Sequence, residues 1–263
     1  MPYENITFTR SEGIAVLVMN RPDVLNALGF EMLDEMVDAV VRCYRDEDVR
    51  ALVLTGTGSA FSAGGDVKAM HRILDDDPSV FFRRLVVLLN GLISSLQRLP
   101  KPVVGAINGV AAGAGFSCAL ACDYVLASDQ ARFVSAYTGI GITPDGGLTY
   151  WLPRLIGTKR AMELILTNRA LDASAALEMG LVNRVVPAGQ LMEEARREAR
   201  ALAQGPTRAF GGAKVLVNFS GEESLQTQME LERQTMAEVS GTGDFREGVT
   251  AFVEKRAPVF RGR

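Results

Sequence analysis

The sequence predicts an α/β protein with a helical C-terminal region. Over the first two thirds of the 263 residues, short apolar stretches typical of strands alternate with helical patterns, and helical patterns dominate the last third. Two glycine-rich segments, each directly after an apolar strand, mark a site for negative charge. We assign residues 1–190 to the α/β core and residues 191–263 to the helical region. The boundary is soft because the amino-acid composition changes little at the junction.

The elements follow from local pattern. Predicted strands bounded by turn residues are 5–10, 14–19, 50–55, 102–108 and 131–136. Helical periodicity or uncharged apolar runs predict helices over 29–46, 67–71, 79–97, 116–122, 158–166 and 173–179. From Leu191 onward the chain is predicted to be mostly helical, with breaks at Gly205-Pro206 and at residues 240–243.

The most informative stretch is residues 101–128, KPVVGAINGVAAGAGFSCALACDYVLAS. A buried strand enters the small residues 109–115, which precede an uncharged helix start. Such a turn leaves backbone N–H groups without carbonyl partners, and glycine and alanine let a ligand approach them. The stretch therefore predicts a site either for a phosphate or for an acyl oxygen that becomes an oxyanion.

A second loop of small residues favours the oxyanion. Residues 56–65, GTGSAFSAGG, follow the strand RALVLT, as the first loop follows KPVVGAI. If the two strands are parallel neighbours, both loops leave the sheet at the same end and present N–H groups to one place. Two donors from separate loops on one oxygen form an oxyanion hole.

Other glycine motifs fit poorly. Neither loop has the G-x-x-x-x-G-K-[ST] spacing of a P-loop, and Gly109, Gly113 and Gly115 lack the G-x-G-x-x-G dinucleotide spacing. Residues 115–119, GFSCA, end in alanine where a nucleophile elbow has glycine, and a serine triad would require His71, the one histidine of the sequence.

Composition excludes several classes. A net charge of −3 without a basic block disfavours nucleic acid and anionic membrane surfaces. Cys43, Cys118 and Cys122 complete neither a disulfide framework nor a metal site, so we expect buried reduced thiols, no metal and a cytoplasmic protein. The N-terminus is charged and unlike a signal peptide, and the uncharged run 102–122 is interrupted by Asn108 and glycines, which indicates core rather than a membrane span.

Motifs in order along nearly the whole chain resemble the crotonase (enoyl-CoA hydratase/isomerase) superfamily. They are NRP…LNAL (20–28), FSAGGDV (61–67), NGVAAGAG (108–115), CD (122–123), PDGG (144–147), LPRLIG (152–157), residues 173–186, and the tail REG…AF…KR…F (246–260).

The resemblance implies a spiral of ββα turns, followed by helices that build a homotrimer or a dimer of trimers. It implies an acyl-CoA thioester as substrate and no separate cofactor, since coenzyme A is part of the substrate. The oxyanion-hole N–H groups would be those of Gly65 and Ala114. CoA would lie against the following residues: Val24, Ala63, Asp66, Val67, Lys68 and Lys255.

The departures from the family pattern bear on the chemistry. Ser117 and Tyr137 stand where typical hydratases carry two glutamates, and both would line the substrate site. The carboxylate nearby is Asp145, in a PDGG pattern similar to the branch with the phenylacetyl-CoA ring-epoxide isomerase, in which an aspartate here serves as acid/base. A purely structural alternative for Asp145 is a turn or helix cap after proline.

These residues predict an acyl-CoA isomerase that stabilises an enolate and shuttles a proton with Asp145. The alternatives are a hydratase of altered substrate range and a non-catalytic acyl-CoA binder; an RNA-binding role is disfavoured by the charge. The acyl group, and with it the pathway, stays open. Its pocket is predicted to be lined by residues 85–96, Phe116, Tyr137 and Leu148.

Overall fold

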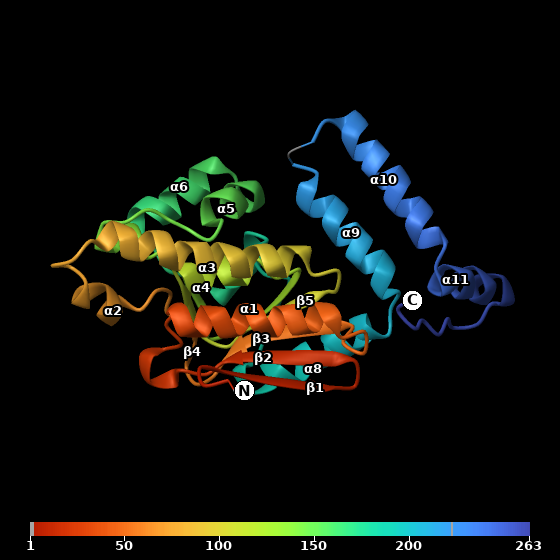
Figure 1. Cartoon of the computed structure of the whole chain (residues 1–263), viewed down its shortest axis with the longest axis horizontal. Coiled ribbons are helices and arrows are strands. Elements are labelled where there is room, and N and C mark those ends of the chain that lie inside the picture. The colour runs from red at the N-terminus through yellow and green to blue at the C-terminus, as the bar shows by residue number, and fades with distance from the viewer. Residues whose placement is uncertain (1–2, 222) are drawn as a thin grey trace.

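The computed structural model describes residues 3–221 and 223–263 (Figure 1). Two sheets lie at its centre. The larger has the strand order β1 (Ile6–Ser11), β2 (Ile14–Met19), β3 (Ala51–Gly56), β5 (Val103–Ile107), β7 (Tyr124–Ser128) and β10 (Arg184–Val186). The smaller has the order β4 (Ala60–Ser62), β6 (Val110–Ala112), β8 (Arg132–Val134) and β9 (Leu171–Asp172).

The chain spirals between the sheets. Strands β3, β5 and β7 are parallel neighbours in the larger sheet, and each is followed directly by a parallel strand of the smaller sheet, β4, β6 and β8. Each turn therefore adds one strand to each sheet before its helical segment, as the expected ββα spiral requires.

The larger sheet is covered on both faces. In β3, Leu52 and Leu54 belong to the main core, whereas Ala51 and Val53 belong to a second, smaller core on the opposite face. This alternation is the period of two of a strand, and it explains why β3 is apolar throughout although half of its side chains point each way.

Helices surround the sheets (Figure 1). Helix α1 (Phe30–Arg45) packs against α3 (Pro78–Arg98), and α8 (Leu191–Ala203) packs against β3 and β5. The remaining helical segments are α2 (Val67–Arg72), α4 (Ala114–Leu120), α5 (Leu148–Ile156), α6 (Thr158–Thr167), α7 (Ala173–Glu178), α9 (Thr207–Phe219), α10 (Leu225–Ser240), α11 (Gly243–Glu254), and the 3₁₀ turns η1 (Pro22–Val24), η2 (Thr138–Ile140) and η3 (Ala188–Gln190).

Most predicted elements are present with ends shifted by one or two residues, but two predictions need correction, and α5, β7, β9 and β10 were not predicted. The loops over 56–65 and 109–115 are not free of regular structure, because each contains a short strand, β4 or β6. The helix predicted over 116–122 begins earlier, at Ala114. Helix α5 was not predicted, since Gly147 at its N-cap and Pro153 in its last turn obscure the helical pattern.

The predicted core residues are largely in place. Residues 102–122 form β5, β6 and α4 and are mostly buried, and the three cysteines are buried and unpaired, as predicted. Within the described part of the chain, α3 alone is long and apolar enough to cross a membrane. Its buried side chains include Leu85, Leu89 and Leu92 in the main core.

The helices after α8 project away from the sheets (Figure 1). Helix α9 is tied to the core by a largely buried ion pair, in which Lys214 Nζ lies 2.7 Å from Asp123 Oδ2. Helix α8, the first helix after residue 190, covers the larger sheet, with Leu191, Ala195 and Ala199 in the second core.

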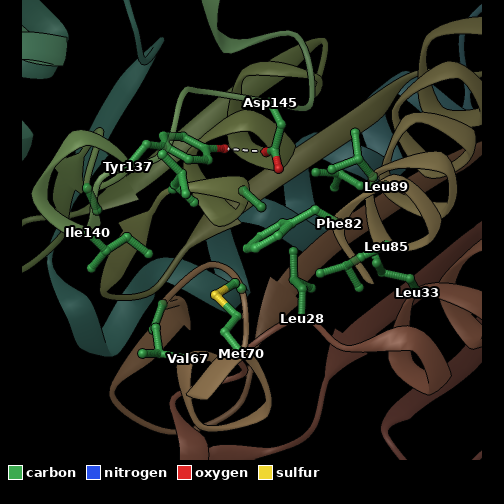
Figure 2. Close-up of a pocket in the computed structure, with 17 residues that line it drawn as sticks. Leu28, Leu33, Val67, Met70, Phe82, Leu85, Leu89, Tyr137, Ile140 and Asp145 are labelled. Atoms are coloured by element: carbon green, nitrogen blue, oxygen red, sulfur yellow. Dashed lines mark hydrogen bonds between the residues drawn. The ribbon is translucent and has the colours of Figure 1, made fainter. Parts of the chain in front are cut away.

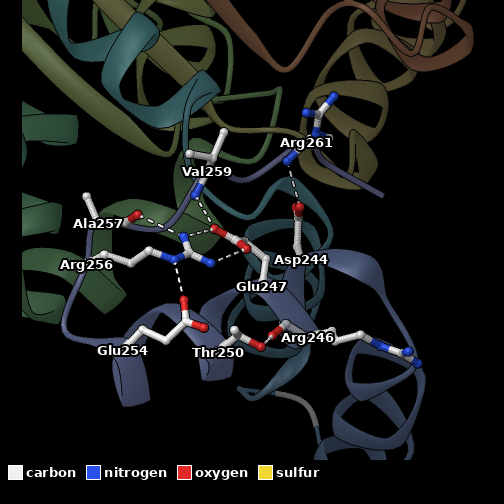
Figure 3. A network of polar contacts seen from close by, with 9 residues as sticks. All are labelled: Asp244, Arg246, Glu247, Thr250, Glu254, Arg256, Ala257, Val259 and Arg261. Carbon is white, nitrogen blue, oxygen red and sulfur yellow. Dashed lines mark hydrogen bonds and ion pairs between the residues drawn. The ribbon is translucent and has the colours of Figure 1, made fainter.

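Polar contacts hold the C-terminal tail against α11 (Figure 3). The carboxylate of Asp244, only 3% exposed, accepts hydrogen bonds from the N–H groups of Arg261 (2.6 Å) and Gly262 (2.8 Å). Glu247 forms an ion pair with Arg256 and accepts the Val259 N–H. The tail motif that carried part of the family resemblance thus fixes the path of the chain end.

Candidate active site

The two glycine-rich loops meet at one end of the smaller sheet. Because β4 and β6 are paired in parallel, both loops emerge on the same side. Gly64 has φ +91°, and a Cβ placed on it would lie 2.7 Å from Ala112 O and 3.4 Å from Ala114 N. Only glycine allows this conformation and this approach, so the prediction that both loops serve one place is confirmed.

Two backbone donors are left free where the loops meet. Gly65 lies outside any helix, and Ala114 is the first residue of α4, whose N–H has no partner within the helix. Among the described residues, no acceptor receives a hydrogen bond from either N–H. Both residues line the same cavity.

The cavity has a volume of about 160 Å³ and a mostly apolar wall (Figure 2). The wall comes from the β2–α1 connection and α1, from both glycine-rich loops, from α2 and α3, and from the segment before α5. The lining residues are Leu28, Leu33, Ala63, Gly65, Val67, Met70, Phe82, Leu85, Val86, Leu89, Gly113, Ala114, Ala136, Tyr137, Ile140, Ile142 and Asp145.

Asp145 brings a carboxylate to this apolar cavity. Burial raises its pKa above the ordinary value, although the hydrogen bond from Tyr137 partly opposes that shift. Tyr137 Oη donates to Asp145 Oδ1 at 2.6 Å (Figure 2) and lies 3.2 Å from Ser117 Oγ. Ser117 Oγ in turn donates to the Asp145 carbonyl at 3.0 Å. Burial and the neighbouring carboxylate raise the pKa of Tyr137, so the phenol stays protonated as a donor.

The Asp145 side chain is not used for capping. The N-cap of α5 is Gly147, which makes no side-chain cap hydrogen bond, and only the Asp145 carbonyl accepts from the helix, from the Leu148 N–H at 3.1 Å. Gly146 and Gly147 have φ +56° and +81°, a conformation that glycine adopts without strain and that turns the carboxylate toward the cavity. The carboxylate therefore does not cap α5 and instead accepts the hydrogen bond from Tyr137.

The enoyl-CoA hydratase/isomerase family model matches residues 9–263. The chain belongs to the enoyl-CoA hydratase/isomerase family. It is 41% identical to a probable enoyl-CoA hydratase of Rhodobacter capsulatus over the whole of both chains. It is 38% identical to the 1,2-epoxyphenylacetyl-CoA isomerase of Escherichia coli, with 96% of each chain covered. A crystal structure of an enoyl-CoA hydratase subunit from Geobacillus kaustophilus superposes with a TM-score of 0.93 at 37% identity, with both chains fully covered.

In this family member, Asp66 and the segment 20–28 brace the loop over residues 56–65. Asp66 accepts the Ala69 N–H at 3.1 Å as the N-cap of α2, and its Oδ2 lies 3.2 Å from Arg21 Nη2. Asn26, fully buried, donates to the carbonyls of Thr57 and Ala60 at 2.9 and 2.8 Å. These contacts explain the NRP…LNAL motif as a brace for the loop that carries Gly65.

The other expected CoA contacts divide into two groups. Ala63 and Val67 line the cavity beside Gly65. Val24 in η1, Lys68 in α2 and Lys255 at the C-cap of α11 do not line it. Lys255 is exposed on the projecting helices, away from the cavity wall.

The predicted acyl-pocket wall is right in part. Leu85, Leu89 and Tyr137 line the cavity, whereas Phe116 and Leu148 do not and are buried in the core at 1% and 0% exposure. Several lining residues were not predicted from the sequence, including Leu28, Leu33, Met70, Phe82, Ile140 and Ile142. Phe82 could have been predicted, because it lies one helical turn before Leu85 on the same face of the helix. The local sequence around Ile140 and Ile142 does not indicate that these residues line the cavity, since they lie at the end of η2 and just after it.

Proposed function

We propose that this family member isomerises an acyl-CoA thioester, with Asp145 as the single acid/base. The observation that carries the proposal is the cavity's composition. Asp145 is the one carboxylate among the described lining residues, and it lies in a cavity with two unused backbone donors. One carboxylate can accept a proton and later return it, which is all that a double-bond shift requires.

The mechanism assigns each group one task. The thioester oxygen binds between the N–H groups of Gly65 and Ala114, which stabilise the enolate as charge develops. Asp145 takes a proton from the α or γ carbon and delivers it to another carbon, so that a double bond moves or a ring rearranges with no net change in atoms. The raised pKa of Asp145 strengthens it as a base and helps it to return the proton.

Hydration is the second candidate, because the Rhodobacter capsulatus relative carries a hydratase name. Adding water requires its activation as well as delivery of a proton to carbon. Ser117 and Tyr137, at the positions matching the hydratase glutamates, are neutral hydroxyl groups, and the high pKa of Tyr137 removes it as a base. Asp145 would have to perform both tasks alone, so isomerisation fits the residues better.

A panel of substrates tests the proposal. The protein is incubated with trans-2-enoyl-CoA, cis-3-enoyl-CoA and ring-epoxide acyl-CoA, and the products are identified by mass and absorbance. Isomers of unchanged mass are expected. A product heavier by one water establishes the hydratase, and binding without conversion of any member establishes a non-catalytic acyl-CoA binder.

Tyr137→Phe is expected to move the acid limb of the pH profile of kcat/KM upward by about one pH unit. The base must be deprotonated, so activity rises with pH through the pKa of Asp145. The Tyr137 hydrogen bond lowers that pKa, and a hydrogen bond to a charged group is worth about 1.5 kcal/mol or more, about one pKa unit. Ser117→Ala, which leaves the Tyr137 donor in place, should move the limb less. An unmoved limb in Tyr137→Phe would contradict the role given to this bond.

We also propose that the projecting helices pack against other copies, as a homotrimer or a dimer of trimers. Large apolar side chains are exposed there, including Met236 (70%) in α10 and Phe252 (84%) and Val253 (74%) in α11. Monomeric proteins rarely leave so much apolar surface together. Light scattering at micromolar concentration should give a mass of three or six chains, and a stable monomer would refute the proposal.

We propose further that the reaction uses no resident cofactor, because the coenzyme A moiety arrives and leaves with the substrate. A cytoplasmic location is proposed from the three buried, unpaired cysteines, since exported proteins more often carry disulfides.

A further inference from the structure

A second hollow lies beside the cavity, on the other side of Leu89. It has a volume of about 400 Å³ and lies between α3, α5 and α9. Its walls include Ile93, Gly146, Trp151 and Phe219, with a polar rim that includes Asn90. Gly65, Ala114 and Asp145, the residues assigned to the reaction, do not line this hollow, so the hollow has no assigned role.

Helix α3 forms one wall of both spaces. Val86 and Leu89 line the cavity, and the residues one helical turn further on, Asn90 and Ile93, line the hollow. A hydrocarbon chain that followed α3 from the cavity would therefore enter the hollow directly after Leu89.

The partition between the two spaces is thin. Gly146 lines the hollow, and a Cβ placed on it would lie 3.1 Å from Leu89 Cδ2 and 2.9 Å from Ser117 Cβ. Leu89 and Gly146 are thus in direct contact, and Leu89, which is 3% exposed, fills the space beside Asp145 (Figure 2). On the cavity side, Leu89 therefore packs against a residue that lines the hollow.

We propose that Leu89 sets the length of the acyl group by closing the cavity at this point. A dry cavity of about 150 Å³ holds a molecule the size of benzene, so the cavity of about 160 Å³ accepts about six carbons. The inference relies on the proposed function only for the thioester at Gly65 and Ala114, which directs the acyl group toward Asp145. The substrates are then short-chain or single-ring acyl-CoAs, and longer chains are rejected by Leu89.

Leu89→Ala, with Leu85→Ala as its matched control, tests the proposal by binding rather than turnover. Both leucines line the cavity from α3 and neither lines the hollow, but only Leu89 is among the side chains nearest to Gly146, which does line it. Dissociation constants are measured for butanoyl-, octanoyl- and dodecanoyl-CoA. For Leu89→Ala, the preference for dodecanoyl- over butanoyl-CoA should exceed that of the unmodified protein by at least about tenfold, the lower end of what apolar-pocket discrimination supplies. Leu85→Ala should not show this gain.

Trp151 gives a direct signal from the hollow. It is the one tryptophan of the sequence, and it lines the hollow but not the cavity. Dodecanoyl-CoA brominated at its terminal carbon should quench Trp151 fluorescence in Leu89→Ala and not in the unmodified protein or Leu85→Ala. Because saturated acyl-CoAs cannot isomerise, this result is independent of the proposed reaction.

The proposal is overturned if the unmodified protein is already quenched, or if Leu89→Ala keeps the unmodified chain-length profile, or if both alanine variants gain long chains equally. Folding is checked by circular dichroism. If Leu89→Ala does not fold, Leu89→Val with octanoyl-CoA is judged by the same criteria. Failure of isomerisation with a positive quenching result would refute the proposed reaction but leave the role of Leu89 standing.

Discussion

Replacing Asp145 by Asn is expected to lower kcat for isomerisation by at least about 100-fold, the lower end of what positioned acid/base groups supply. Asparagine has nearly the same shape, and its oxygen can still accept the Tyr137 hydrogen bond seen at 2.6 Å. It cannot take a proton from carbon. Affinity for acyl-CoA should be retained, because the backbone donors of Gly65 and Ala114 are unchanged.

Two further measurements make the Asp145 prediction specific. Solvent deuterium should stop entering the acyl α or γ carbon in Asp145→Asn, whereas Ser117→Ala should lose less than about tenfold in kcat. The thermal midpoint should not fall, because burial raises the pKa of Asp145 and its charged form therefore disfavours folding above its ordinary pKa. If Asp145→Asn exchanges and turns over normally while Ser117→Ala or Tyr137→Phe is inactive, the assignment of Asp145 is wrong.

Replacing Ala114 by Pro is expected to reduce turnover by at least about 100-fold, because proline has no N–H to donate to the oxyanion. The structure makes this a clean test. Ala114 is the first residue of α4, the position at which a helix tolerates proline best, and its N–H has no acceptor within the helix to lose. The variant should therefore fold, which circular dichroism checks.

Ala114→Gly is the matched control, because it keeps the N–H and removes only a methyl group. It should retain most of the turnover. A folded Ala114→Pro variant with full activity would place the oxyanion hole elsewhere, and equal losses in both variants would point to packing around Gly113 and Ala114 rather than to the missing donor.

The sequence by itself determined the α/β class, the strands around residues 50–55 and 102–108, and the glycine-rich loops. These features are local: apolar β-branched runs favour strands, and positions such as Gly64, at φ +91°, demand glycine. The ordered motifs also identified the family, which the match over residues 9–263 shows.

The tertiary structure decided what depends on distant partners. Strands β4 and β6, three residues each and rich in small side chains, have no local strand signal and exist because they pair with each other. Ile140, at the end of η2, and Ile142 likewise become part of the cavity wall only because the fold brings them to the same cavity as residues of α2 and α3.

The clearest case is Asp145. Its sequence context, PDGG, is compatible with a turn, a helix cap and a catalytic base. Aspartate after proline is favoured in turns and caps, and the same carboxylate can also act as a base. The structure leaves the N-cap to Gly147, places the carboxylate in a hydrogen bond with Tyr137, and brings Asp145 to the same cavity as Gly65 and Ala114. Local propensity determines which backbone shapes a segment can adopt, but burial and hydrogen-bond partners, which set the pKa of Asp145, are fixed only when distant segments pack together.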